Sequence, residues 1–256
     1  MTRWPGMTTT ALEKPRRRGA LTWGVVGLLA QVAFAAGWVV AETWQGPRYS
    51  PLTDTISDLQ AATAPHAWSP AVCFAVGGLG TFGFAVFGLG PAWAGAVRVA
   101  PWAIGLSGLA LGNSFPQIPC QLSALGCTAT SQLLSAGGLT DAILSGAALW
   151  MLAITPLQLA RLLTPLPHWS ALVRLLRVAG VVALAGYGLL ALALLTGIWP
   201  GLVERALVVV CQPWLAVVAV TLIRTSGVEH GLSADRPSRR RRRREPSSQT
   251  PPPMRD

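Results

Sequence analysis

Long apolar runs alternate with short polar segments along most of this 256-residue chain. About 20 apolar residues suffice to cross the hydrocarbon core of a bilayer as a helix. Six such runs lie near residues 20–41, 69–90, 99–115, 137–158, 175–198 and 203–223. The pattern therefore predicts an all-α fold, a polytopic transmembrane bundle of six helices.

The composition supports a membrane class. The chain is 52% hydrophobic and only 12% charged, about half the charge of a typical soluble domain, and its mean hydropathy is +0.47. The first run follows Arg16–Arg18 as a signal peptide would. However, it continues to Val40, beyond the 7–15 apolar residues usual for such a peptide, so we expect an uncleaved first helix.

Basic residues are distributed very unevenly between the two sides of these runs. Of the 20 Lys and Arg residues, 18 fall in the two terminal segments or in the second and fourth connections. Only Arg48 and Arg205 fall on the opposite side. The positive-inside rule then predicts that both termini are cytoplasmic. Because 19 of the 20 are Arg, a GC-rich bacterial genome is indicated, and we expect a multi-pass protein of the inner cell membrane.

Three regions follow from this pattern. Residues 1–19 form a basic cytoplasmic arm, residues 20–223 form the transmembrane domain, and residues 224–256 form an Arg/Pro-rich tail too poor in apolar residues to fold. The net charge is +10. Since the basic segments adjoin the predicted membrane exits, their expected partner is anionic lipid rather than nucleic acid. Binding of the Arg239–Arg244 run to a protein stays an alternative.

The first outer segment has the features of a helix start. Ser50 can cap it, and Pro51 suits the first helical position because proline lacks the N–H that would be unpaired there. One face is apolar, with Leu52, Ile56 and Leu59, and the other is polar, with Thr53, Asp54, Ser57 and Asp58. We expect a short amphipathic helix lying across the outer mouth of the bundle.

Asp54 and Asp58 are four residues apart and would be neighbours on that helix. They could form a cation or headgroup site, or an acid/base pair. Alternatively they form a solvated face with a salt bridge to the bundle rim. Arg205, which follows Glu204 at the start of the sixth run, is the best partner for such a bridge, and Arg48 competes with it.

Further polar residues fall on the same outer side. Asp141 follows Thr140 early in the fourth run, and Asn113, Ser114 and Gln117 end the third. An ionisable residue inside a membrane is functional by default, whereas one at the boundary is a helix-start acid. We expect an outward-facing polar binding site formed by Asp54, Ser57, Asp58, Asn113, Asp141 and Arg205.

The second outer segment contains Cys120 and Cys127, separated by six residues. An extracytoplasmic loop permits disulfides, so we expect this pair to be bonded, two free thiols being the alternative. Cys73 and Cys211 lie within runs and would act as small apolar residues. His66 would lie outside, and His168 and His230 inside, so they cannot share a metal. No metal site and no cofactor is expected.

Small residues predict where helices approach closely. Gly108 and Gly112 are four apart in the third run, and Gly77, Thr81 and Ala85 share one stripe of the second. Such faces allow the backbones of membrane helices to touch.

Three short motifs carry a resemblance to a known family: Ile56-Ser57-Asp58-Leu59, Phe115-Pro116, and Gly201-Leu202-Val203-Glu204-Arg205. Residues 20–223 resemble the bacterial membrane family catalogued as domain of unknown function 998, itself distantly similar to eukaryotic Frag/DRAM/Sfk-type proteins. The resemblance implies a six-helix bundle and no established activity. Members carry a Cys directly after Phe-Pro and often a His near the fourth span. Here Gln117-Ile118-Pro119 precede Cys120, and residues 131–140 contain no His.

Taken together, these features favour a non-catalytic membrane protein that binds a lipid, an amphiphile or a partner at its outer mouth. A transporter or channel subunit is an alternative that would need charge at mid-span, where Gln31 and Gln212 are the nearest candidates. A lipid-modifying enzyme using Asp54, Asp58 or Asp141 is another. The chain contains no nucleophile elbow, Walker loop or dinucleotide fingerprint.

Overall fold

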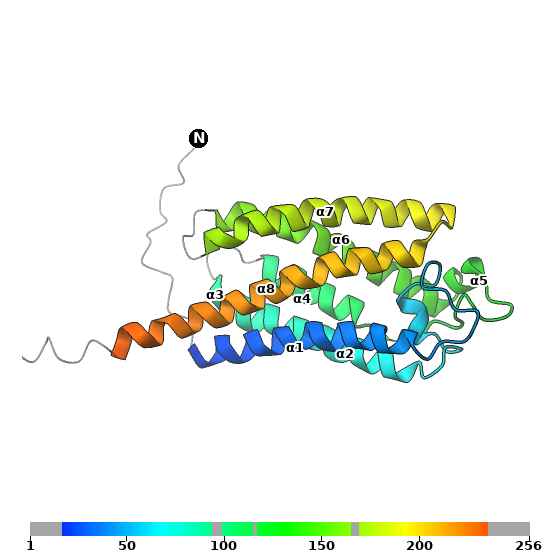
Figure 1. Cartoon of the computed structure of the whole chain (residues 1–256), viewed down its shortest axis with the longest axis horizontal. Coiled ribbons are helices and arrows are strands. Elements are labelled where there is room, and N and C mark those ends of the chain that lie inside the picture. Colours follow the sequence, from blue (N-terminus) through cyan, green and yellow to red (C-terminus); the bar gives the residue numbers. More distant parts are fainter. Residues whose placement is uncertain (1–16, 94–98, 115–116, 165–168, 235–256) are drawn as a thin grey trace, which may run out of the picture.

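A computed structural model describes residues 17–93, 99–114, 117–164 and 169–234, and these residues form helices and loops without strands (Figure 1). The long helices are α1 (Arg17–Glu42), α2 (Trp68–Gly83), α4 (Val99–Leu111), α6 (Ala136–Leu163), α7 (Ser170–Thr196) and α8 (Pro200–Ala234). The short elements are the 3-10 helix η1 (Ser57–Gln60), the π-helix η2 (Phe84–Leu89), α3 (Gly90–Ala92) and α5 (Ala129–Leu133). Helices α2, η2 and α3 follow one another without a break.

The six long helices pack as a closed ring in chain order. Each contacts the next, from α1 through α2, α4, α6 and α7 to α8, and α8 returns to α1. The loops at residues 43–67 and 117–135, here called the loop cap, gather at one end of the bundle (Figure 1). Helix α1 begins and α8 ends at the opposite end, so the described chain enters and leaves the bundle on the same side.

Five helical segments are long and apolar enough to cross a membrane. They are Gly19–Glu42, Trp68–Ala92, Ala136–Leu163, Ser170–Thr196 and Pro200–Thr225. Each covers most of a run from which a span was predicted. Within the described residues, the third run gives the 13-residue helix α4, about 20 Å long at 1.5 Å per residue, which is shorter than the ~30 Å hydrocarbon core.

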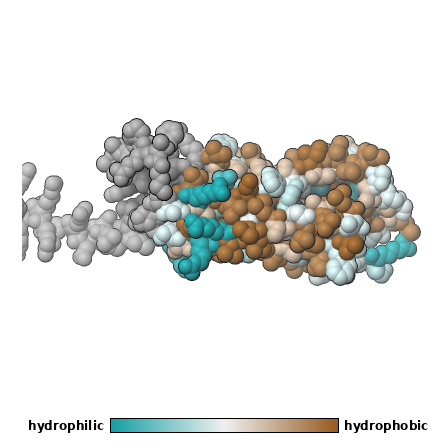
Figure 2. Space-filling model, turned by 90° about the horizontal axis from the view of Figure 1, so that it is seen from above, coloured by the Kyte–Doolittle hydropathy of each residue, from teal (hydrophilic) through white to brown (hydrophobic). Residues whose placement is uncertain are grey.

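The surface of the described bundle is largely apolar. Hydrophobic side chains dominate its flank, and hydrophilic ones gather towards its two ends (Figure 2). Leu29, Val32, Leu79, Val181 and Leu189 are all exposed by more than half. Large exposed apolar faces would be costly in water but are neutral in lipid, so this surface agrees with a membrane protein.

Helices α2 and α4 meet through Gly108 and Gly112, the pair predicted in the third run, but the α2 glycine between them is Gly78 and not the predicted Gly77. A Cβ atom on Gly78 would lie 2.5 Å from the carbonyl oxygen of Gly108, and one on Gly112 would lie 3.0 Å from the Cα of Gly78. Gly108 in turn faces Thr81, and a Cβ atom on Gly108 would lie 2.7 Å from that side chain. We call Gly78, Gly108 and Gly112 the glycine contact. Gly77 instead faces Phe34 of α1.

One predicted helix end differs from the structure, and several predictions concern residues that the structure does not describe. Helix α8 continues to Ala234 instead of ending near residue 223, because the first proline after Pro213 is Pro237 and nothing stronger than glycine interrupts the helix earlier. The predictions for residues 1–16, for the Arg239–Arg244 run, for Phe115-Pro116 and for His168 lie outside the described residues.

Candidate functional site

The segment expected to be an amphipathic helix is mostly a series of turns. The amides of Thr53 and Asp54 donate to the Ser50 carbonyl at 3.0 and 2.8 Å, and regular helix is confined to the four residues of η1. The hydrogen bond at Ser50 also runs in the direction opposite to the expected cap. The Asp54 carboxylate accepts the Ser50 N–H at 2.7 Å, where the Ser50 hydroxyl was expected to cap the chain.

The two carboxylates of this segment are buried rather than solvated. Asp54 is 2% exposed and Asp58 is 1% exposed, so the predicted polar face turned to water is wrong. Ile56 and Leu59 are buried as predicted, but Leu52 is 44% exposed. The turns place both acids among backbone N–H groups, which a continuous helix would have used internally. Burial raises the pKa of the Asp54 carboxyl; the Ser50 N–H opposes this rise and the Asp58 charge adds to it.

Arg205 holds the first loop to the bundle. Its Nε lies 2.5 Å from Oε1 of Glu42, its Nη2 donates to the Tyr49 hydroxyl, and the residue is only 8% exposed. Its Nη1 donates to three carbonyl oxygens, those of Pro51, Asp54 and Gly201, at 3.0, 2.7 and 2.9 Å. The predicted pairing of Arg205 with Asp58 is therefore wrong, and Arg48 is exposed.

The ionic partner that the sequence interpretation missed is Glu42. It ends α1 as Arg205 begins the second turn of α8, and α1 and α8 are neighbours in the ring. The only sequence signal for it was an acid at the outer end of the first run. Glu204 had been named beside Arg205 and in the last of the three motifs, but without a contact of its own. Its Oε2 accepts the N–H of Ile56 at 2.7 Å and so fixes the start of η1.

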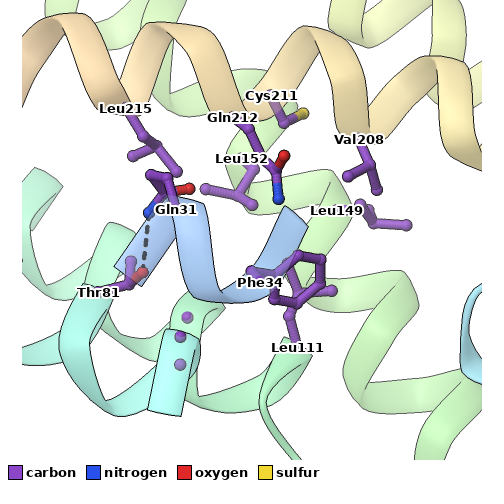
Figure 3. Close-up of a pocket in the computed structure, with 13 residues that line it drawn as sticks. Gln31, Phe34, Thr81, Leu111, Leu149, Leu152, Val208, Cys211, Gln212 and Leu215 are labelled. Carbon is purple, nitrogen blue, oxygen red and sulfur yellow. Dashed lines mark hydrogen bonds between the residues drawn. The ribbon is translucent and has the colours of Figure 1, made fainter. Parts of the chain in front are cut away.

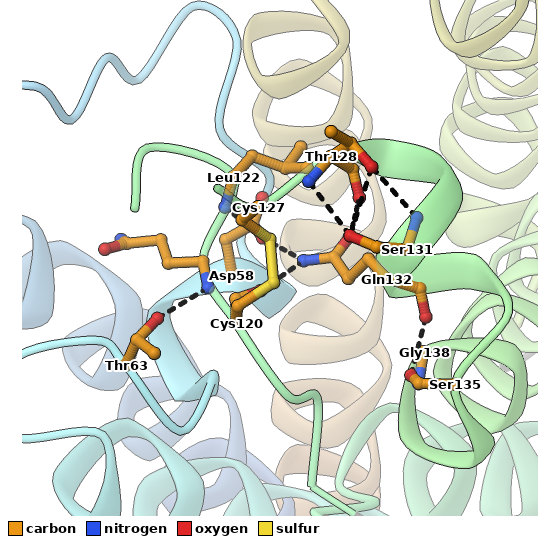
Figure 4. The surroundings of a disulfide bond; sticks show 11 residues. Asp58, Thr63, Cys120, Leu122, Cys127, Thr128, Ser131, Gln132, Ser135 and Gly138 are labelled. Atoms are coloured by element: carbon orange, nitrogen blue, oxygen red, sulfur yellow. Dashed lines mark hydrogen bonds between the residues drawn. A yellow bond between two sulfur atoms is a disulfide. The ribbon is translucent and has the colours of Figure 1, made fainter. Parts of the chain in front are cut away.

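Asp58 connects the two loops of the cap. Its Oδ2 accepts the amide and the hydroxyl of Thr55, both at 2.9 Å. Its Oδ1 accepts the side-chain amide of Gln132 at 2.7 Å and the N–H of Leu122 at 3.4 Å. Four donors therefore surround one carboxylate, and Figure 4 shows the two that come from the second loop, Leu122 and Gln132. Both oxygens of Asp58 already accept hydrogen bonds within the protein, so the carboxylate has little capacity left to bind a ligand.

A disulfide closes the second loop beside Asp58. Cys120 and Cys127 are joined at an S–S distance of 1.96 Å (Figure 4). Gln132, which donates to Asp58, also donates to the Cys120 carbonyl at 2.7 Å. The next residue, Gln121, donates its N–H to the Thr63 hydroxyl of the first loop at 2.8 Å. The disulfide thus holds the segment that covers Asp58. Cys73 and Cys211 are free.

Polar residues from four segments border a small cavity under the cap. The volume in it that is open to the centres of water-sized molecules is about 10 Å³. Its lining comprises Gln60, Asn113, Ser114, Gln117, Ile118 and Asp141. The structure thus brings Asn113 and Asp141 together, as predicted, but engages Asp54, Asp58 and Arg205 in the cap. Asp141 accepts the Ser145 hydroxyl at 3.1 Å, and Ser57 is a further hydrogen-bonding neighbour of its carboxylate.

Gln60 organises this cavity and was not among the predicted site residues. Its Oε1 accepts the Ser114 hydroxyl at 3.1 Å, its Nε2 donates to the Asn113 carbonyl at 3.4 Å, and its own carbonyl accepts Nε2 of Gln117 at 3.0 Å. Gln60 is 6% exposed. Its position at the end of the Ile-Ser-Asp-Leu motif was the one available signal.

A larger groove opens beside this cavity between α2 and α4. It has a volume of about 560 Å³ and shares Gln60, Asn113, Ser114 and Gln117 with the cavity. The remaining lining is Trp68, Ala71, Val72, Ala75, Gly78, Leu79, Leu109 and Gly112. Trp68, Val72 and Leu79 are 70%, 54% and 63% exposed, so the groove opens outwards, where lipid would lie. It is apolar along the helices and polar, without charge, at its capped end.

Among the described residues, no group of three or more His, Cys, Asp or Glu side chains is placed to hold a metal ion. His66 packs edge-on against Trp44, with ring centroids 5.4 Å apart. The chemistry that the described cap offers is therefore hydrogen bonding by amides and hydroxyls, next to one carboxylate, Asp141.

Comparison with known proteins gives one match. A family model described as a protein of unknown function (DUF998) matches residues 25–221. No curated protein and no solved structure matches the chain. The matched region includes α2, α4, α6 and α7 in full, most of the membrane segments of α1 and α8, and the whole loop cap. The chain therefore belongs to the DUF998 family of proteins of unknown function.

Proposed function

We propose that this chain is a six-span protein of the inner membrane that binds a membrane lipid or a similar amphiphile in the groove between α2 and α4. In this proposal the loop cap is extracytoplasmic, both termini are cytoplasmic, and α4 with its flanking residues is the sixth span. The distribution of Lys and Arg supports this orientation, and the disulfide in the cap fits an oxidising compartment.

The observation that carries the proposal is the change in the lining of the groove, which is apolar along the helices and polar at its capped end. Acyl chains favour the apolar walls formed by Val72, Ala75 and Leu79, while the amides of Asn113 and Gln117 lie at the end where a headgroup would be. Small-molecule sites commonly combine apolar walls with a few polar groups that fix orientation. The volume of about 560 Å³ falls within the ~300–1,000 Å³ typical of such sites.

Binding is better supported than catalysis or transport by the described residues. Acid/base catalysis needs carboxylates free to exchange protons with a substrate, but Asp58 accepts four hydrogen bonds and Asp54 holds a turn. Only Asp141 borders the small cavity. Ion transport usually needs charge inside the spans, and the lining of the central cavity described below is uncharged.

The groove can be tested by filling it. Ala75 lines the groove, whereas the adjacent Val76 is 54% exposed on another face of α2. We expect native mass spectrometry of protein in detergent with a defined phospholipid to show one fewer retained lipid for Ala75→Phe. The control Val76→Phe should retain lipid as the parent does. Equal retention by all three proteins would contradict the groove as the binding site.

The orientation can be tested separately in a protein whose free cysteines, Cys73 and Cys211, are replaced by Ala. A membrane-impermeant maleimide applied to whole cells should label Arg48→Cys in the cap. It should label Arg174→Cys, at the other end of the bundle, only after the membrane is opened. Both positions are exposed. The reverse pattern would overturn the topology and leave the groove intact as a structural feature.

A further inference from the structure

A second cavity lies inside the ring of helices. It is bordered by α1, α2, α4, α6 and α8 (Figure 3). Its apolar lining includes Phe34, Leu111, Leu149, Leu152, Val208 and Leu215. Two glutamines also reach it, Gln31 from the middle of α1 and Gln212 from α8. No residue that lines it in the described structure is charged.

The two glutamines offer complementary hydrogen-bonding groups. Nε2 of Gln31 donates to the Thr81 hydroxyl at 3.0 Å, which leaves the amide oxygen of Gln31 to accept a hydrogen bond. Gln31 is 9% exposed. Nε2 of Gln212 is fully buried and has no hydrogen-bond partner among the described residues. Figure 3 shows the two amide groups turned towards the same space, with Leu152 between their helices.

A buried amide N–H without a partner is rare in folded proteins, because its desolvation is not offset. The size of the cavity limits what could be that partner. The volume open to the centres of water-sized molecules is about 30 Å³, and one water needs about 10–15 Å³ by this measure. A lipid chain or a metabolite is too large for it. A cation is disfavoured because the unpaired group is a hydrogen-bond donor.

We propose that this cavity binds water, one or two molecules, which accept a hydrogen bond from Gln212 and donate one to the amide oxygen of Gln31. A neutral hydrated site would then lie among the transmembrane helices, separated from the groove by the glycine contact. Gly78 borders both spaces. This inference does not depend on the groove binding a lipid.

The direct test is transfer of magnetisation from water to side-chain N–H groups in solid-state NMR of the full chain in lipid bilayers. We expect the Gln212 side-chain amide to receive water magnetisation. The internal control is the Trp214 indole N–H, which is also buried and without a partner among the described residues but does not line the cavity. The signal of the Gln212 side chain can be assigned in the parent protein through its correlation with the neighbouring Pro213, so that no variant is needed. Absence of transfer to Gln212 would overturn the proposal.

A double-mutant cycle gives an independent readout. If water connects the two glutamines, Gln212→Leu should lower the melting temperature of the parent protein and have a much smaller effect in a Gln31→Leu background. If the amide is dry, Gln212→Leu should raise the melting temperature in both backgrounds, and the proposal fails. Gln158→Leu makes the same chemical change at an exposed position of α6 and reports the effect of the substitution alone.

Discussion

The loop cap and the middle of the bundle bury polar groups in different ways. The cap buries Asp54, Asp58 and Arg205, each 8% exposed or less. The middle buries only neutral groups such as Gln31 and Thr81. The difference follows from the backbone. Loops have free N–H and C=O groups that can surround a charge, as the carbonyls of Pro51 and Asp54 do for Arg205. Helices use theirs internally, so a charge at mid-span would have no such partners.

The two regions are also held together by different kinds of contact. The cap is held by directional contacts between segments that are far apart in sequence, such as Arg205 with Glu42 and Gln132 with Asp58. The middle is held by close approach of backbones at the glycine contact. Substitutions should therefore act through lost charge partners in the cap and through steric overlap in the middle.

Removing Arg205 should give the largest effect. Arg205→Ala leaves Glu42 without its cation and three carbonyls without a donor, so we expect a loss of about 3 kcal/mol or more in the free energy of unfolding. Arg205→Lys should recover part of it, because an ammonium cannot contact Glu42, Tyr49 and three carbonyls at once. The measurement is thermal unfolding in detergent. Arg48→Ala, at the exposed arginine of the first loop, should leave the transition unchanged, and an equal loss there would contradict the assignment.

The glycine contact should give the next largest effect. In Gly78→Ala the new methyl group would overlap the Gly108 carbonyl, because the Cβ position is 2.5 Å from that oxygen. Separating α2 from α4 should cost about 1–3 kcal/mol. The control is Gly146→Ala in α6, where nothing lies within 4 Å of the new atom. It should stabilise the helix by about 0.5–1 kcal/mol. Similar effects at both sites would show that the contact is not tight.

The disulfide should contribute less. Its loop joins residues only seven apart, for which chain entropy predicts about 2 kcal/mol of stabilisation. We expect the double variant Cys120→Ala/Cys127→Ala to melt at a lower temperature than the parent. A reducing agent should lower the melting temperature of the parent to that of the variant and leave the variant unchanged. Cys73→Ala removes a free thiol and serves as the control. A reductant effect that persists in the double variant would place its cause elsewhere.

The sequence predicted the helices better than the contacts of the cap. Long apolar runs suffice to locate helices such as α6 and α7, because the period and length of a span are local properties. The α4 side of the glycine contact was also predictable, since Gly108 and Gly112 are four apart in one helix, whereas Gly78 on α2 was not predicted. The cysteine spacing indicated the disulfide for the same local reason.

Partner choice in the cap could not be predicted in the same way. Arg205 pairs with Glu42, 163 residues away, because α1 and α8 are neighbours when the ring closes. Nothing in the local spacing of Asp54 and Asp58 indicates that loop amides surround both acids. The helix predicted from Ser50 and Pro51 failed because the carboxylate of Asp54 took the Ser50 N–H and favoured turns. Gln60 was missed because its three contacts all come from the end of α4 and the loop after it.

The smallest expected effect is the contribution of Asp54, in the cap, to the dependence of stability on pH. The pKa of Asp54 is raised from its ordinary value of 3.8 by burial, so the folded state takes up a proton at higher pH than the unfolded state does. Stability should therefore rise as pH falls from neutral through the raised pKa towards 3.8, and be lower above it. Asp54→Asn keeps an acceptor for the Ser50 N–H and removes the titration, so its melting temperature should change less with pH than that of the parent. Gln212→Leu, in the middle of the bundle, should leave the pH dependence of the parent unaltered because it removes no titratable group. Parallel pH profiles for the parent and Asp54→Asn would show that this carboxylate does not titrate in the folded cap over that range.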